Sequence, residues 1–151
     1  MKKIAKFLCL MMAFITTKNY AQQSVTSKFE PAKATLSEYH ALYVINESDE
    51  NKIKAIIRNI NNALEDPRLK GKLKVELLAF GAGVEMYKKM NAYEPLLITL
   101  KNKGVVMVQC ENTLNEKKIS KNELFDFVNY TPSANGEIII REYEGWAIVK
   151  P

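Results

Sequence analysis

The segment "GVVMVQCENT" (residues 104–113) contains the feature that decides the fold of this 151-residue chain. A glycine is followed by four apolar residues, then by Gln109 and Cys110, and the sequence turns polar directly after the cysteine. An unbroken apolar run of this length predicts a strand that is buried on both faces, as parallel sheets require. The segment also raises the functional question, because Cys110 either fills the core at the end of this strand or presents a thiol to a substrate.

Three further runs of strand length accompany residues 105–110. Apolar, β-branched and aromatic residues are concentrated at residues 39–46, 72–80 and 146–150. Short runs of this composition, bounded by polar or turn-forming residues, are typical of strands. The sequence therefore predicts at least four strands.

Helical patterns separate these runs. Isoleucines recur at helical spacing within residues 47–67, which predicts a long amphipathic helix. Pro95 suits a first helical position and Gly104 a left-handed residue after the last turn, so a second helix is expected between them. Ser120 and Glu123 have the spacing of a capping box, which predicts a helix start there.

The segment "GEIIIREYEG" (136–145) fits two structures. Its three consecutive isoleucines favour a strand, whereas its length between two glycines also suits a two-turn helix. Either way, strands alternate with helices along the chain, which predicts right-handed β-α-β crossovers. The expected fold class is α/β, a three-layer sandwich with a mostly parallel sheet of four to five strands.

The N-terminal region is expected to lie outside the folded domain. Residues 1–21 combine a basic start, an apolar run at 7–15 and a possible cleavage site after Ala21, which is the layout of a secretory signal peptide. Residues 22–38 are mostly polar without a sustained period and are interpreted as a flexible tether. The α/β domain is expected to span residues 39–151.

Cleavage of this segment changes the charge of the protein. The formal net charge falls from +5 to +1, because the removed residues carry four lysines and no acidic residue. The mature chain then has no basic excess that would predict a nucleic-acid partner. No other segment is apolar enough to span a bilayer, so we expect an exported protein, periplasmic or secreted, without a membrane contact after cleavage.

Cleavage also leaves one cysteine. The sequence has two, and Cys9 is removed with the signal peptide, so the mature chain retains Cys110 alone. A disulfide within one chain is thereby excluded. A single thiol in an oxidising compartment is buried, paired with another molecule, or reactive.

A candidate site follows from the position of Cys110 at a strand end. Ligands of open parallel sheets bind at the carboxyl ends of the strands, where the strand order reverses. If the order is 2-1-3-4, that reversal lies between the first and third strands. The predicted site then combines Cys110 as the nucleophile with a substrate-binding set, namely Asn46, Gly81, Gly83, Asn112 and Thr113. Glu111 opposes a thiolate beside it, and a buried, inert Cys110 is the alternative.

Other candidate motifs are better explained structurally. His40 starts a strand, at the end opposite the predicted crevice, so a Cys–His pair is not expected. The acidic segment at residues 47–51 lacks the glycine and the glutamate spacing of an EF-hand, and no metal site is predicted. The glycines at residues 81–83 are followed by Met86 where a dinucleotide-binding motif requires glycine, so no nucleotide cofactor is expected either.

The segment "GVVMVQCENTL" (104–114) resembles a pattern of the DsrE/DsrF-like family, in which the third strand ends in a cysteine within "GV-x-F-x-x-C-x-N-T". The resemblance covers about residues 40–151. It includes "HALYVIN" (40–46), "VELLAFGAGV" (75–84) and "GWAIVKP" (145–151) in matching order. The fold that it implies is flavodoxin-like, of DsrE/F topology.

This resemblance also implies a helix over residues 137–144 and a function in sulfur handling. Cys110 would carry sulfane sulfur as a persulfide, and Asn112 and Thr113, which match the motif, would shape its loop. Members of the family tend to form trimers or hexamers and need no cofactor for this step. One departure is Phe80, which stands where relatives often have histidine.

Three functional hypotheses follow. The first is an exported sulfurtransferase-like carrier, in which Cys110 takes sulfur from a donor protein or a small sulfane-sulfur compound and passes it to an acceptor. The second is a non-enzymatic, homo-oligomeric binding module that holds a small ligand in the same crevice. The third is a redox protein that forms mixed disulfides with a partner. The residues alone do not decide whether the protein is an enzyme.

Overall fold

The structure is a computed structural model that describes residues 28–151. The predicted signal peptide and the first residues of the predicted tether lie outside the described residues. Residues 28–38 form no helix or strand. The compact unit that contains all described helices and strands spans Lys33–Pro151. Within the described range, no helix combines the length and the apolar character needed to cross a membrane.

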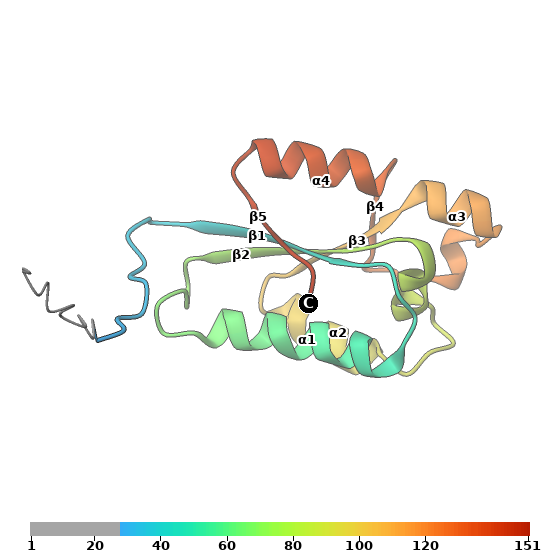
Figure 1. The fold of residues 1–151 in the computed structure, drawn as a ribbon. Coiled ribbons are helices and arrows are strands. Elements are labelled where there is room, and N and C mark those ends of the chain that lie inside the picture. Colours follow the sequence, from blue (N-terminus) through green and yellow to red (C-terminus); the bar gives the residue numbers. More distant parts are fainter. Residues whose placement is uncertain (1–27) are drawn as a thin grey trace, which may run out of the picture. The chain divides into compact units, whose positions relative to one another are not determined.

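Five parallel strands form one sheet (Figure 1). They are β1 (Tyr39–Ile45), β2 (Leu73–Ala79), β3 (Val106–Cys110), β4 (Asn129–Thr131) and β5 (Ala147–Val149). The order across the sheet is β4-β3-β2-β1-β5. The parallel sheet is therefore confirmed, but the assumed order 2-1-3-4 is wrong. Each of the first three crossovers places the next strand directly beside the previous one, so β2 lies between β1 and β3.

Helices cover both faces of this sheet, which confirms the three-layer sandwich. α1 (Glu50–Glu65) and α2 (Glu94–Asn102) lie on one face, and α4 (Ala134–Tyr143) lies on the other (Figure 1). The short α3 (Glu111–Lys117) follows β3 at the carboxyl edge. We call the two sides of the sheet the α1/α2 face and the α4 face.

The larger core lies on the α1/α2 face. α1 contributes the isoleucines that the sequence pattern singled out, namely Ile53, Ile56, Ile57 and Ile60, all buried. Asp49 caps this helix, because its carboxylate accepts a hydrogen bond from the backbone N–H of Lys52 at 2.9 Å. Tyr87 is fully buried in the same core, and its hydroxyl donates to the carbonyl of Leu77 at 2.6 Å. This face holds most of the apolar surface that stabilises the fold.

The α4 face has a smaller core. Its buried cluster consists of six residues, namely Leu42, Val44, Leu78, Val108, Cys110 and Ala134. α4 buries only one of its own residues, Ala134, and leaves Ile139, Ile140 and Tyr143 exposed. The smaller core on this face is therefore accompanied by apolar side chains of α4 that remain exposed.

Two segments differ from their sequence-based prediction. The capping box of Ser120 and Glu123 is present, but it starts only one turn of 3-10 helix, η2 (Lys121–Glu123). The chain then turns into the core, and the backbone N–H of Phe125 donates to the carbonyl of Tyr87 at 3.0 Å. The burial of the residues after Glu123 thus ends the helix that local sequence favours.

Residues 137–143 of the ambiguous segment are helical, as the family resemblance implied. They belong to α4, whose N-cap Ser133 accepts a hydrogen bond from the backbone N–H of Gly136 at 3.3 Å. Residues 112 and 113, which we expected in a polar loop, lie instead in α3. The segment at residues 81–87 forms a 3-10 helix, η1 (Gly81–Tyr87).

Candidate functional site

The crevice of this sheet lies between β3 and β4. After β3 the chain passes through α3 and then packs Leu124 and Phe125 into the core of the α1/α2 face. After β4 it enters α4 on the opposite face. Loops that leave adjacent strands toward opposite faces open a crevice at the carboxyl edge. The predicted location between the first and third strands was therefore wrong, although Cys110 lies at the true crevice.

A cleft of about 210 Å³ occupies this position. Four of the predicted site residues line it: Gly81, Cys110, Asn112 and Thr113. They come from the start of η1, the end of β3 and the first turn of α3. We call this cavity the Cys110 cleft.

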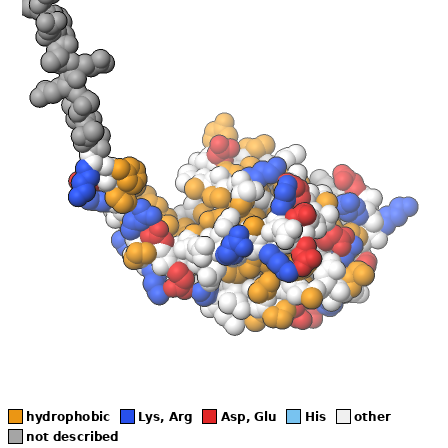
Figure 2. Space-filling model, turned by 60° about the horizontal axis from the view of Figure 1, so that its bottom comes forward, with side chains coloured by type: hydrophobic (Ala, Val, Ile, Leu, Met, Phe, Trp, Pro, Cys, Tyr) orange, Lys and Arg blue, Asp and Glu red, His pale blue; other side chains and the backbone are white. Residues whose placement is uncertain are grey.

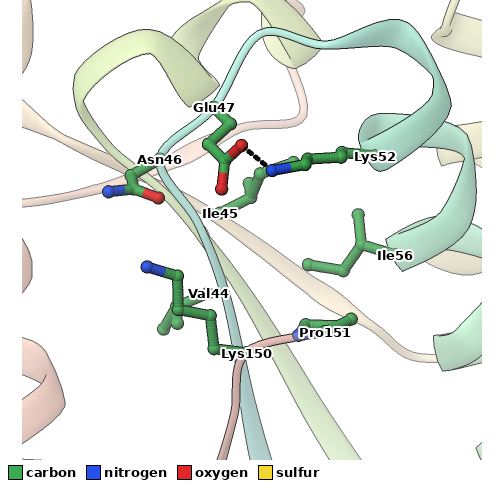
Figure 3. Close-up of a pocket in the computed structure, with 8 residues that line it drawn as sticks. All are labelled: Val44, Ile45, Asn46, Glu47, Lys52, Ile56, Lys150 and Pro151. Carbon is green, nitrogen blue, oxygen red and sulfur yellow. Dashed lines mark hydrogen bonds and ion pairs between the residues drawn. The ribbon is translucent and has the colours of Figure 1, made fainter.

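The other two predicted residues lie elsewhere. Asn46 lines a separate pocket of about 20 Å³, with Glu47, Lys52 and Lys150 among its neighbours (Figure 3). The side-chain oxygen of Asn46 is buried without a hydrogen-bond partner, and a cavity of this size accommodates one water. Glu47 forms an ion pair with Lys52 across the opening. This pocket is too small for a substrate.

Gly83 has a packing role. A Cβ atom on this residue would lie 2.3 Å from the carbonyl oxygen of Ile45, a distance that real Cβ atoms do not adopt. η1 can therefore approach the end of β1 only because residue 83 has no side chain. Gly83 supports the loop that carries Gly81 but does not line the Cys110 cleft.

The sulfur of Cys110 is held at the start of α4. Cys110 is 4% exposed and is both the last residue of β3 and the N-cap of α3. Its Sγ accepts a hydrogen bond from the backbone N–H of Ala134, the first residue of α4, at 3.3 Å. A backbone N–H at a helix N-terminus favours negative charge on the sulfur. The carboxylate of the adjacent Glu111 is paired with Lys121 at 2.5 Å.

Hydrogen bonds tie the three loops around this sulfur together. The backbone N–H of Gly81 donates to the hydroxyl of Thr113 at 2.9 Å. The backbone N–H of Asn112 donates to the carbonyl of Pro132 at 3.3 Å. Gly81 has a φ of +53°, in the left-handed region that favours glycine. Hydrogen bonds within the protein thus position the walls of the cleft.

Sequence reasoning missed the side of the cleft that follows β4. Ser133, Ala134 and Asn135 line it there, and Glu116 of α3 is its one charged residue. Ser133 could have been recognised as an N-cap before the isoleucine run, but its proximity to Cys110 depends on β4, which is only three residues long. Within residues 28–151, no cluster of His, Cys, Asp and Glu could hold a metal ion. The chemistry of this cleft is that of a thiol among amide and hydroxyl groups.

A buried ion pair lies under α4, on the same face as Cys110. Glu76 of β2 is 2% exposed, and its carboxylate lies 2.9 Å from the guanidinium of Arg141. Burial raises the pKa of Glu76, and the positive charge of Arg141 opposes this rise. Arg141 also pairs with Glu137 at 2.9 Å and stacks 4.3 Å from the ring of Trp146. The pair attaches the last turn of α4 to the sheet.

His40 lies away from this chemistry. Its Nε2 pairs with Glu38 at 2.6 Å at the start of β1, and its ring packs 4.8 Å from Trp146. Both contacts lie at the start of β1, whereas Cys110 lies at the end of β3.

Fold and cleft together define an α/β sandwich protein with one buried cysteine at the carboxyl edge of its parallel sheet. The solved structure of MTH1491 from Methanobacterium thermoautotrophicum, a protein of unknown function, is similar to this chain with 29% identity and a TM-score of 0.71. It covers 76% of this chain and 100% of its own.

Two more distant structures share the fold alone. BT1422 from Bacteroides thetaiotaomicron, a conserved protein of unknown function, has 8% identity and a TM-score of 0.60 over 74% of this chain and 94% of its own. The ychN protein from E. coli has 12% identity and a TM-score of 0.56 over 77% of this chain and 100% of its own. No family model and no curated protein matches the sequence.

Proposed function

We propose that this protein is a sulfur carrier in which Cys110 holds sulfane sulfur as a persulfide. The observation that carries the proposal is the hydrogen bond from the Ala134 N–H to the sulfur, at the wall of a preformed cleft. A buried cysteine that served only as core filling would need neither the donor nor the cleft. The sequence resemblance described above supports the same role.

The reaction consists of two sulfur exchanges. The Cys110 thiolate attacks the outer sulfur of a donor R–S–SH, a new S–S bond forms at Cys110, the donor S–S bond breaks, and RS⁻ leaves. An acceptor thiolate then attacks the outer sulfur of the Cys110 persulfide and releases the Cys110 thiolate. No net oxidation occurs, and both steps need only thiols. The Ala134 N–H stabilises the negative sulfur before the first step and after the second.

The direct test is the mass of the purified native protein before and after incubation with a persulfide donor. We expect a gain of one sulfur atom, which a thiol acceptor removes and which Cys110→Ser abolishes. The same spectrum checks the predicted signal cleavage, since the exported chain should begin at Gln22. A mass that never changes, together with a thiol that reacts only after unfolding, would contradict the proposal.

A second variant tests the role of the N–H. Ala134→Pro removes this donor at a first helical position, where proline fits, and Ser133 before it already has the extended backbone that precedes proline. The helix should persist, while alkylation of native Cys110 at neutral pH slows by a factor on the order of ten, because a hydrogen bond to the charged form is lost. Ala134→Ser keeps the N–H and should react like the parent protein.

The alternative is an exported, non-enzymatic, homo-oligomeric module that binds a small polar ligand in the same cleft. The low exposure of Cys110 is the observation that favours it. In that case ligand binding survives Cys110→Ser and no persulfide forms.

Self-association is proposed for either function. Ile139, Ile140 and Tyr143 on α4 are 55%, 55% and 91% exposed. Exposed apolar side chains gathered on one helix are typical of an interface. A trimer or hexamer formed through α4 would bring several clefts into one particle.

A further inference from the structure

A second cavity lies on the opposite side of the sheet, between α1 and α2. It is a groove of about 440 Å³, within the range of ligand-binding pockets. Figure 2 brings this side of the molecule forward and shows basic and acidic side chains interspersed with hydrophobic ones. We call this cavity the α1–α2 groove. It shares no lining residue with the Cys110 cleft.

The groove has an apolar floor. Ile57 of α1 and Leu100 of α2 are buried core residues that line it, and Leu96 lines it with 41% of its surface exposed. Thr99 contributes a hydroxyl that already donates to the carbonyl of Pro95 within α2 at 2.9 Å. Asn61 of α1 also lines the groove, and its side-chain oxygen accepts a hydrogen bond from Lys103 at 2.6 Å. The apolar floor therefore offers contact to an alkyl chain.

The charge of the groove is positive. Its charged lining residues are Lys54 and Arg58, and no acidic residue lines it. Lys54 is paired with Glu50. Arg58 has no hydrogen bond or ion pair within the described part of the chain, whereas the other two arginines there, Arg68 and Arg141, are paired with carboxylates. An unpaired guanidinium beside an apolar floor matches a carboxylate that carries an apolar body.

We propose that the α1–α2 groove binds an amphipathic carboxylate of the fatty-acid type. The alkyl chain lies on Ile57, Leu96 and Leu100, and the carboxylate accepts two hydrogen bonds from the Arg58 guanidinium. Lys54 lies one turn before Arg58 on α1, with its charge paired to Glu50. The inference does not depend on sulfur transfer, because none of these residues belongs to the Cys110 cleft.

The test uses the purified ¹⁵N-labelled protein and decanoate below its micelle concentration. Saturable shifts in the amide spectrum should be confined to α1 and α2 around Ile57, Thr99 and Leu100. Arg58→Gln should weaken binding at least about tenfold, since a charge-assisted pair is lost. Lys52→Gln, on the same helix but outside the groove, is the matched control and should bind like the parent protein. Cys110→Ser should bind decanoate unchanged.

Three outcomes would overturn the proposal. Decanol, which has the same chain without the charge, must bind at least about tenfold more weakly than decanoate; equal binding means that Arg58 plays no part. Shifts at the same amides on dilution without any ligand would show instead that the groove is an interface between copies of this chain. Shifts that do not saturate would mean non-specific adsorption and would also reject the site.

Discussion

The two faces of the sheet differ in what their buried residues do. The α1/α2 face is filled by isoleucine, leucine and aromatic side chains, many of them without any exposed surface. The α4 face buries a cysteine and a carboxylate, and its single helix leaves apolar residues exposed. The difference shows how one side of a sandwich supplies the stability while the other accommodates groups that cost stability and allow chemistry.

The two cavities, one on each face, also differ in the charge of their lining residues. The Cys110 cleft has Glu116 as its one charged lining residue, whereas the α1–α2 groove is lined by Lys54 and Arg58. Ligands of opposite character are therefore expected on the two sides. If both proposals hold, the protein binds its sulfur donor and a carboxylate independently.

The largest expected effect is a difference in stability between core substitutions on the two faces of the sheet. Ile60→Ala on α1 removes a side chain with no exposed surface and should lower the free energy of unfolding by about 3 kcal/mol. Ile138→Ala on α4 removes the same atoms from a half-buried position and should cost about 1 kcal/mol. Urea denaturation of both variants measures the difference. Equal losses would mean that the α4 face contributes as much as the α1/α2 face.

A smaller loss is expected from the buried ion pair. Arg141→Met keeps the apolar stem of the side chain but leaves the carboxylate of Glu76 buried without its cation, which should cost about 2 kcal/mol at neutral pH. Glu76→Gln in the same background removes the buried charge and should restore part of that loss. If Arg141→Met alone is neutral, α4 is not attached to the sheet by this pair.

The same pair gives the stability a pH dependence. A carboxyl group whose pKa is higher in the folded than in the unfolded chain binds its proton more tightly when folded. Because burial raises the pKa of Glu76 above its ordinary value of 4.5, its stabilising contribution is full below that value and is lost as the pH rises through the folded pKa. Glu76→Gln should flatten this decline, and Arg141→Met should move it to higher pH. Thermal unfolding across pH 4 to 8 distinguishes the three proteins.

The smallest effect on stability is expected on the outer side of α4. Replacing Ile139 and Tyr143 by serine should change the free energy of unfolding by no more than about 0.5 kcal/mol per site, because both side chains are largely exposed. The mass in solution, measured by light scattering, should nevertheless fall toward that of a single chain. Glu142→Gln, at an exposed position between them, serves as the control. An unchanged mass would remove α4 as the interface.

The sequence predicted those helices and strands that depend on the pattern of neighbouring residues. The apolar strands and the isoleucine stripe of α1 follow from periodicity, and Cys110 was correctly placed at a strand end. The strand order was not predictable in this way, because it depends on which neighbour each crossover selects. β4 escaped detection because three residues carry no periodic signal. A capping box likewise did not predict the length of η2, since the burial of Phe125 overrides it.

Only the part of the candidate site that lies on β3 and α3 was predictable from the sequence. The motif residues of β3 and α3 lie together in sequence, so their proximity was expected. Ala134, which donates to the sulfur, is 24 residues away from Cys110, and its approach depends on the short β4. The ion pair of Glu76 was not predicted either. Its partner, Arg141, lies 65 residues further along the chain, and a single acidic residue in an apolar strand does not indicate which cation it pairs with.

Both outer strands of the sheet are short. β4 and β5 have three residues each, compared with seven in β1 and in β2. Each outer strand therefore offers another chain a pairing edge of only three residues. If copies of this protein associate as proposed above, helix side chains should form the contact, because a three-residue edge is too short to extend the sheet into a long fibril.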